Sequence, residues 1–201
     1  MAANTKRRSR INYLVKVALL SALSFVLMYL EFPIGIVPPW LKLDFSDLPA
    51  VLAAFSLGPV AGVICQVVKV LLFTLIHGTT SGFIGELGNL LMGIALVLPA
   101  GLIYKYKHNR KFALISMIVG IVSMTVMSFI SNYFLLIPVY AEMMGLEAII
   151  GMCTAIVPAA DSVMAYCLIF AMPFTFAKAL IDCIVIFLCY KKISPILHKQ
   201  Y

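Results

Sequence analysis

Charged residues are scarce in this sequence. They make up 11% of the 201 residues, and only 8 of them are acidic, whereas 63% of the chain is hydrophobic. This composition excludes an ordinary soluble globular protein, because it leaves too few polar side chains to cover a surface in water. A mean hydropathy of +1.07 is instead typical of a chain that lies in a lipid bilayer. We therefore predict an integral membrane protein.

Motifs that carry chemistry are also missing. The sequence contains no GxxxxGK[ST] phosphate loop, no HExxH and no GxSxG, so the chain cannot be an ATPase by itself and offers no recognisable catalytic set. Five cysteines, an odd number without CxxC spacing, indicate neither a disulfide framework nor a zinc site. His77 has no second His or Cys at ligand spacing, and we expect it to be solvated or interfacial. These absences predict a protein that is not an enzyme and holds no metal or cofactor.

The apolar run over residues 48–76 decides how many helices cross the bilayer. It is long for one helix, which needs about 20 apolar residues, and it contains Gly58 and Pro59. Basic residues cluster at 6–10, 105–111 and 191–199, and short basic loops mark the cytoplasmic side. Only a helix break at Gly58 and Pro59 puts all three clusters on that side.

The sequence therefore predicts an all-α integral membrane protein with six transmembrane helices and both termini in the cytoplasm. We expect a single domain over residues 1–201 in the cell membrane, as a multi-pass protein. The first apolar run is expected to be a retained span and not a removed signal. The expected segments are a basic tail at 1–10, spans at roughly 12–30, 48–57, 59–76, 83–104, 112–138 and 172–190, an outer loop at 31–47, and an outer loop or interfacial segment at 139–171.

The formal charge of +7 arises from the three basic clusters. No folded domain presents these clusters as a groove, so we expect no nucleic-acid partner. Membrane topology and contact with anionic lipid explain the charge better.

Four ionisable residues fall within or beside the expected spans, where charge is costly and usually functional or paired. Lys178 and Asp182 stand at i and i+4 on one helix face, so they either form a structural ion pair or Lys178 meets a ligand. Lys69 is expected to have a structural role, in a pair with Glu86 or with Asp47. Glu86 serves either helix packing or a bound molecule.

A ligand pocket is predicted in the outer half of the membrane, because polar residues from five separate segments fall there. Acids outnumber bases in that half, which favours a neutral, polyhydroxylated or amide-bearing aromatic ligand. Aromatic side chains supply flat surfaces for a ring. Asp47 is expected to cap the next helix, and Asp44 either contacts the ligand or orders the loop. The substrate-binding candidates are Trp40, Leu41, Asp44, Glu86, Asn89, Asn132, Tyr133, Phe174, Thr175 and Lys178.

Small residues at i and i+4 mark two possible packing faces. Gly58 and Gly62 most simply permit close approach of neighbouring helices. Ala18 and Ala22 in the first span do the same, or form an exposed face that docks a partner.

Four segments carry a resemblance to a known family. They are LKLDFSDLPA at 41–50, GPVAG at 58–62, SNYFLLIPVY at 131–140 and PFTFAK at 173–178. Together they resemble the riboflavin-specific substrate-binding (S) component of energy-coupling factor (ECF) vitamin transporters, over nearly the whole chain. The resemblance implies a six-helix fold and high-affinity capture of riboflavin from outside the cell.

The resemblance also implies partners and residue roles. The partners are a transmembrane coupling subunit, docked through Ala18 and Ala22, and two cytoplasmic ATPase subunits, which fits the missing phosphate loop. The polar site residues would contact riboflavin, with Lys178 bonded to flavin or ribityl oxygens, and Trp40 and Leu41 would pack on the rings or gate them. The family often has Asn at the place of Thr175.

Two other functions stay open at the level of sequence. One is a self-sufficient, ion-coupled carrier of a small aromatic vitamin or related molecule, with Glu86 or Asp182 as its coupling site. The other is a membrane enzyme that uses Glu86 and His77.

Overall fold

The computed structural model describes residues 2–79 and 82–198, and the side chains of residues 10–79 and 82–188. The side chains of the basic segments at 1–9 and 191–199 therefore lie outside the described part. The elements, in chain order, are α1 (Ala2–Tyr29), β1 (Phe32–Pro33), β2 (Lys42–Leu43), α2 (Asp47–Leu57), α3 (Pro59–His77), α4 (Ile84–Tyr106), α5 (Arg110–Ser131), the π-helix η1 (Asn132–Leu136), α6 (Ile137–Met144), α7 (Leu146–Ile156), α8 (Val163–Tyr166), the π-helix η2 (Cys167–Ala171) and α9 (Met172–His198).

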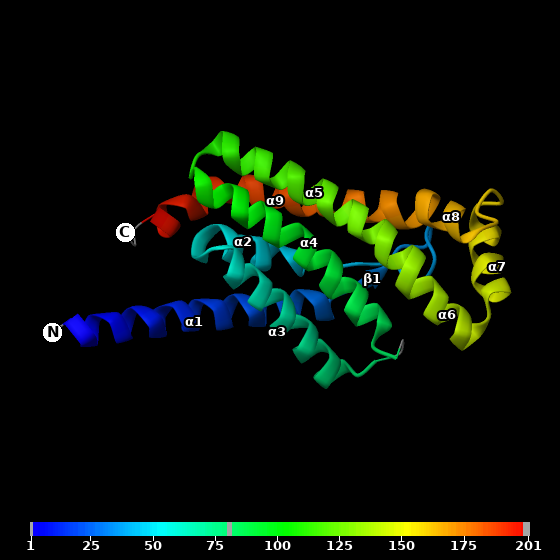
Figure 1. The fold of residues 1–201 in the computed structure, drawn as a ribbon, viewed down its shortest axis with the longest axis horizontal. Coiled ribbons are helices and arrows are strands. Elements are labelled where there is room, and N and C mark those ends of the chain that lie inside the picture. The colour runs from blue at the N-terminus through cyan, green and yellow to red at the C-terminus, as the bar shows by residue number, and fades with distance from the viewer. Residues whose placement is uncertain (1, 80–81, 199–201) are drawn as a thin grey trace.

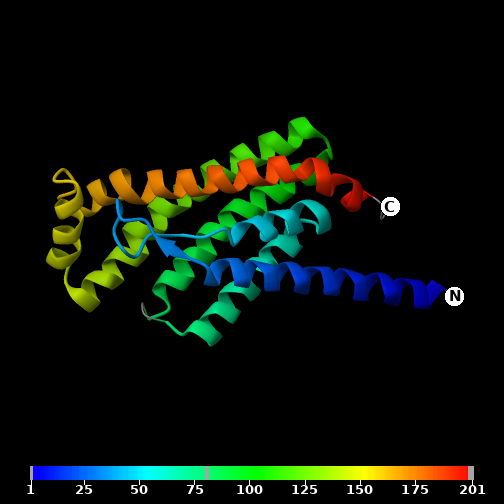
Figure 2. The same ribbon diagram turned by 180° about the vertical axis from the view of Figure 1, so that it is seen from behind.

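The helices form an elongated bundle with both chain ends on the same side (Figures 1 and 2). The turn between α4 and α5, which carries the basic residues around 105–111, lies at that end as well. We call it the terminal end. The opposite end carries α7 and the loop at 30–46, and we call it the cap end.

Five helical segments of the described chain are long and apolar enough to cross a membrane. They are Arg10–Tyr29, Pro59–His77, Ile84–Tyr106, Arg110–Met144 and Val163–Leu188. The predicted all-α membrane fold is confirmed, apart from the two-residue strands β1 and β2. Helix α2 is apolar but has only 11 residues, so the count of six crossings stays a prediction.

The expected break inside residues 48–76 is present. Helix α2 ends at Leu57 and α3 begins at Pro59, with Gly58 at a φ of 101° between them. Glycine adopts this conformation without the Cβ clash that other residues suffer, and proline suits the first turn of a helix. Gly62 does pack closely, because a Cβ there would lie 2.7 Å from the Ala54 Cβ, whereas a Cβ at Gly58 would meet no atom within 4 Å. Gly58 therefore serves the turn and not a packing face.

Two π-helices let long helices continue past proline. Segment η1 precedes Pro138 and η2 precedes Pro173, and in each case the proline stands in the first turn of the helix that follows. The wider π turn shifts the hydrogen-bond register, and the residue after η1, Ile137, donates its N–H to the Asn132 carbonyl. The spans expected at 112–138 and 172–190 thus lie within longer helical runs. Most of the expected segment 139–171 is helical, as α6, α7, α8 and η2.

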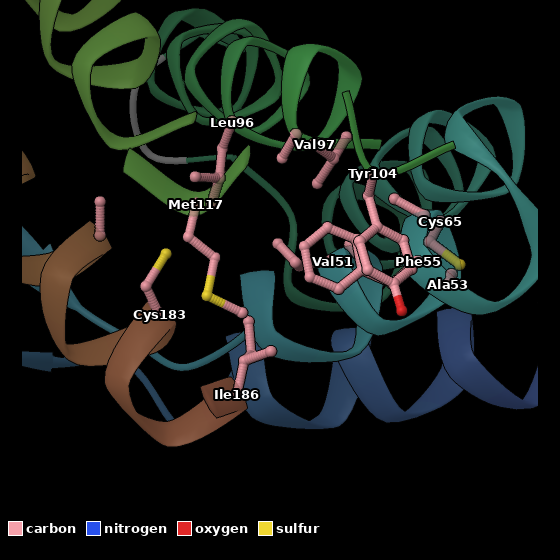
Figure 3. Close-up of a cluster of buried hydrophobic side chains, with 14 of the residues drawn as sticks. Val51, Ala53, Phe55, Cys65, Leu96, Val97, Tyr104, Met117, Cys183 and Ile186 are labelled. Carbon is pink, nitrogen blue, oxygen red and sulfur yellow. The ribbon is translucent and has the colours of Figure 1, made fainter. Parts of the chain in front are cut away.

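Apolar side chains gather in two main clusters. The bundle core packs residues of α1 to α5 with α9, and Figure 3 shows its centre, where the rings of Phe55 and Tyr104 stack at 4.5 Å. The cap core packs α7, α8 and η2 against η1 and the loop at 30–46, around the buried Tyr166. The two clusters share no residue.

The loop at 30–46 folds back over the cap end. Strands β1 and β2 pair antiparallel, with Phe32 opposite Leu43, and Lys42 forms an ion pair with Glu31 across the hairpin. The loop runs along the bundle as far as α8 before it returns to α2 (Figures 1 and 2). Its return leg carries Trp40, Leu41 and Asp44 toward the helices.

Candidate functional site

A cavity lies between the loop at 30–46 and the helices at the cap end. It brings together nine of the ten predicted substrate-binding residues, from the loop, α4, η1 and α9. The tenth, Tyr133, does not line it, because its ring stacks on Phe129 and meets the edge of Phe134. The lining residues are Met28, Glu31, Trp40, Leu41, Lys42, Asp44, Phe73, His77, Gly85, Glu86, Asn89, Met92, Met124, Asn132, Leu136, Tyr140, Phe174, Thr175 and Lys178.

Buried charges form an ionic cluster at one wall of this cavity. The Lys178 ammonium donates to Asp44 Oδ2 at 2.8 Å and lies 3.5 Å from Asp47 Oδ2. The Lys69 ammonium donates to Asp47 Oδ1 at 2.7 Å and to Ser46 Oγ at 2.8 Å. Both acids and both lysines are buried. Burial of charge is tolerable only with such partners, so this ionic cluster fixes the loop to α3 and α9.

The ionic cluster contains other partners for the lysines than local sequence spacing suggests. Lys178 pairs with Asp44, which stands 134 positions away in sequence, and not with Asp182 one helical turn further on. Asp182 is fully buried, and neither of its oxygens has a hydrogen-bond partner among the described residues. Lys69 forms its ion pair with Asp47, one of the two partners that the sequence suggested, and not with Glu86.

The expected helix cap at Asp47 was wrong. Asp47 is the first residue of α2, Ser46 occupies the cap position, and no side chain caps the helix. Two groups from α3, Lys69 and Gln66, already use the Asp47 carboxylate. Asp44 instead orders the loop locally, since its Oδ1 accepts from the Ser46 backbone N–H at 2.9 Å.

The start of α4 supplies further polar groups to the lining of the cavity. Glu86, in its first turn, accepts a hydrogen bond from the Thr79 hydroxyl at 3.2 Å. Asn89 follows almost one turn later, and its side-chain oxygen is buried without a hydrogen-bond partner among the described residues. Because an unbonded buried acceptor is costly, Asn89 is suited to a ligand that offers an N–H or O–H.

A chain of hydrogen bonds runs from the loop into α5. Trp40 Nε1 donates to the Tyr166 hydroxyl at 2.9 Å, and that hydroxyl donates to Asn132 Oδ1 at 3.1 Å. Asn132 Nδ2 donates in turn to the Ser128 carbonyl at 2.8 Å. The Ser128 and Thr175 hydroxyls bond each other at 2.8 Å. Both π-helices start beside this chain, as π-helices often do at functional sites.

Sequence reasoning missed several of these groups. Ser128 precedes Asn132 by one helical turn, a spacing that would have placed both on one face. His77 is exposed, as expected for a solvated or interfacial residue, but it also stacks on Phe73 at 4.7 Å and lines the cavity, which was not predicted. Nothing in the local sequence marks Tyr166, because its partners stand 126 and 34 positions earlier.

Comparison with known proteins gives consistent matches over most of the chain. The family model described as the substrate-specific component of ECF transporters matches residues 12–190. The chain is 31% identical to the riboflavin transporter FmnP of Bacillus subtilis, over 95% of this chain and 96% of that protein. It is 35% identical to the riboflavin transporter RibU of Staphylococcus aureus, over 92% of each. A solved structure of the S component of a bacterial ECF transporter superposes with a TM-score of 0.74 at 34% identity, over 94% of this chain and 99% of that one.

Proposed function

Because this chain belongs to the family of ECF transporter substrate-specific components, we propose that it captures riboflavin in its cavity as the substrate-specific subunit of an ATP-driven uptake transporter. The chain is a multi-pass protein of the cell membrane, and members of its family are transporter components and not enzymes. The observation that carries the proposal is the cavity itself. It combines aromatic and thioether side chains with a few convergent polar groups, as small-molecule sites do.

The charges around the cavity favour a neutral ligand. Its two lysines are both paired with acids, Lys42 with Glu31 and Lys178 with Asp44. A phosphate group would therefore find both lysines already paired and would share the cavity with the Glu86 carboxylate. Riboflavin, which carries polar groups without a phosphate, fits this balance better than flavin mononucleotide.

The polar side chains have complementary hydrogen-bonding capacity. Lys178 has three N–H donors, and its two acid partners leave one for a ligand oxygen. Asn89 offers the opposite, an unused acceptor. We assign Trp40, Leu41 and Phe174 to packing on the flavin rings. Glu86, Asn132 and Thr175 complete the polar wall.

We propose that the terminal end faces the cytoplasm. The turn between α4 and α5, with its basic residues around 105–111, lies there beside both chain ends, and basic loops favour the cytoplasmic side. The cap end then faces outward, as capture from outside requires. The partners would be a transmembrane coupling subunit and two cytoplasmic ATPase subunits, because the sequence has no phosphate loop.

A flavin titration tests the proposed ligand. The purified protein is expected to bind riboflavin tightly and to quench its fluorescence, because the ring would lie between aromatic side chains. Flavin mononucleotide is expected to bind at least about tenfold more weakly, equivalent to about 1.4 kcal/mol. Undiminished flavin fluorescence at a stoichiometric protein concentration would contradict the proposal, and equal affinity for the two flavins would contradict its charge argument.

The partner-docking face gives a second prediction. Ala18 and Ala22 are exposed on α1, next to the exposed Leu14 and Leu19, and small residues permit close helix contact. Replacing both alanines with leucine is expected to lower riboflavin uptake in cells by about tenfold while leaving the affinity of the purified protein unchanged. Uptake and affinity are measured side by side.

The control for this experiment is Ala155→Leu, an exposed alanine on α7 at the cap end, which should leave uptake intact. Normal uptake by the Ala18→Leu/Ala22→Leu variant would refute the docking face. Sustained uphill uptake by this chain alone in proteoliposomes would refute the ATP-driven mechanism and support an ion-coupled carrier.

A further inference from the structure

Tyr166 is fully buried in the cap core and does not line the cavity. Its hydroxyl nevertheless contacts two residues that do. It accepts from Trp40 Nε1 at 2.9 Å and donates to Asn132 Oδ1 at 3.1 Å. A tyrosine hydroxyl has one proton to donate, so the direction of the whole chain is set by Trp40, whose indole can only donate.

The bond to Trp40 bridges two parts of the molecule that are distant in sequence. Trp40 belongs to the loop at 30–46, and Tyr166 ends α8, 126 positions later. The ring centroids lie 6.1 Å apart and tilted at 52°, so ring packing brings the two side chains together without fixing the indole in one orientation. The directional hydrogen bond supplies that orientation.

The second hydrogen bond of the Tyr166 hydroxyl, to Asn132, orients a residue that lines the cavity. The Asn132 amide is held at both ends along this line, since its oxygen accepts from the Tyr166 hydroxyl and its Nδ2 donates to the Ser128 carbonyl. The second lone pair of the oxygen stays available to a ligand. Asn132 also begins η1, where the helix changes its hydrogen-bond register. The orientation of the Asn132 amide is therefore fixed by Tyr166, a residue that does not line the cavity.

We infer that Tyr166 is a positioning residue, whose hydroxyl locks the Trp40 side chain over the cavity and orients Asn132 in its wall. The inference rests on the proposed function for its ligand, but the lock itself exists without one. Closure of the loop over a bound molecule then depends on the hydroxyl, and the residence time of the ligand depends on closure. The ring of Tyr166 has the separate task of filling the cap core.

The substitution Tyr166→Phe separates these two tasks, because it keeps the ring and removes only the hydroxyl. Riboflavin is expected to dissociate about tenfold faster from this variant, as the loss of one buried hydrogen bond predicts, with little change in the association rate. The dissociation rate is measured in stopped flow, from the recovery of flavin fluorescence after the complex is diluted into a large excess of buffer that contains no protein. Tyr133→Phe is the matched control, because Tyr133 lies beside Asn132 but packs on Phe129 outside the cavity.

A second readout needs no ligand. Trp40 is the only tryptophan in the chain, so intrinsic tryptophan emission reports on this side chain alone. Acrylamide is expected to quench Trp40 more strongly in Tyr166→Phe than in the wild type or in Tyr133→Phe. Trp40→Phe should accelerate dissociation by itself. The double variant with Tyr166→Phe should dissociate more slowly than the product of the two single effects predicts, because both substitutions remove the bond between Trp40 and Tyr166 and only Tyr166→Phe also removes the bond to Asn132.

The two readouts separate failure of the inference from failure of the proposed function. Unchanged acrylamide quenching in Tyr166→Phe would overturn the lock, whatever the ligand is. Stronger quenching supports it even if riboflavin does not bind, in which case only the proposed function has failed. Additive effects of Trp40→Phe and Tyr166→Phe on dissociation would also overturn it.

Discussion

Replacing Lys178 by methionine is expected to weaken riboflavin binding by about 100-fold or more, equivalent to about 2.7 kcal/mol. The substitution removes a donor to the ligand and also leaves Asp44 buried without its cation, 2.8 Å from where the ammonium stood. Loss of one member of a buried ion pair is costly because the other charge stays behind. The affinity is measured by the same fluorescence titration. Lys105→Met, at an exposed lysine of the terminal end, serves as the control.

The double variant Lys178→Met/Asp44→Asn separates the two losses. It removes both charges, so it should regain the thermal stability lost in the single variant. It should not regain the affinity, because the Lys178 donor is still missing. Wild-type affinity in the double variant would show that Lys178 only holds Asp44 in place, and would contradict its assignment as a ligand contact.

Lys69→Met should produce the largest loss of stability. Lys69 is fully buried and bonds Asp47 at 2.7 Å. Its removal leaves the buried Asp47 carboxylate with the neutral Gln66 amide and the more distant Lys178 ammonium, 3.5 Å away. Such losses cost about 3 to 5 kcal/mol, which corresponds to a fall in melting temperature of about 10 °C for a chain of this size. The buried Cys65, Cys153, Cys167 and Cys183 allow melting to be followed with a thiol-reactive dye.

Asp182→Asn is the matched control for the Lys69 prediction. Asp182 is as buried as Asp47 but has no hydrogen bond to any described residue, so the change to an amide should alter the melting temperature by no more than about 3 °C. Lys69→Met/Asp47→Asn should melt closer to the wild type than Lys69→Met does. A Lys69→Met variant as stable as the wild type would show that Asp47 is solvated or otherwise compensated.

Local patterns in the sequence were sufficient to predict the long helices and the break between α2 and α3. Gly58 and Pro59, combined with the distribution of basic residues, predicted the separation of α2 from α3 that the structure has. Helix ends were harder to predict. Pro138 and Pro173 are normally signals of a helix boundary, but each follows a π-helix that accommodates the missing N–H. No composition or period distinguishes such a π turn from the end of a helix.

Most residues predicted to share a pocket do line one cavity, but most of their hydrogen-bond and ion-pair partners could not be predicted. Nine candidates line one cavity because polar groups in apolar helices are rare and have few places to meet. For Lys178 the sequence offered only Asp182, its neighbour on the helix face, as a possible ion-pair partner beside a ligand, since only local spacing is visible in a single sequence. The structure instead brings Asp44 from the far loop. The same limit hid Tyr166, whose role depends entirely on contacts across the fold.

The separation of the bundle core from the cap core has an energetic consequence for loading and release. The two cores share no residue, and the ionic cluster joins the loop to α3 and α9 of the bundle. Contiguous packing units of this kind open with separate free energies. Opening of the smaller cap core to admit or release the vitamin is therefore expected to cost less than global unfolding. The bundle core need not open for this step, because none of its residues belongs to the cap core.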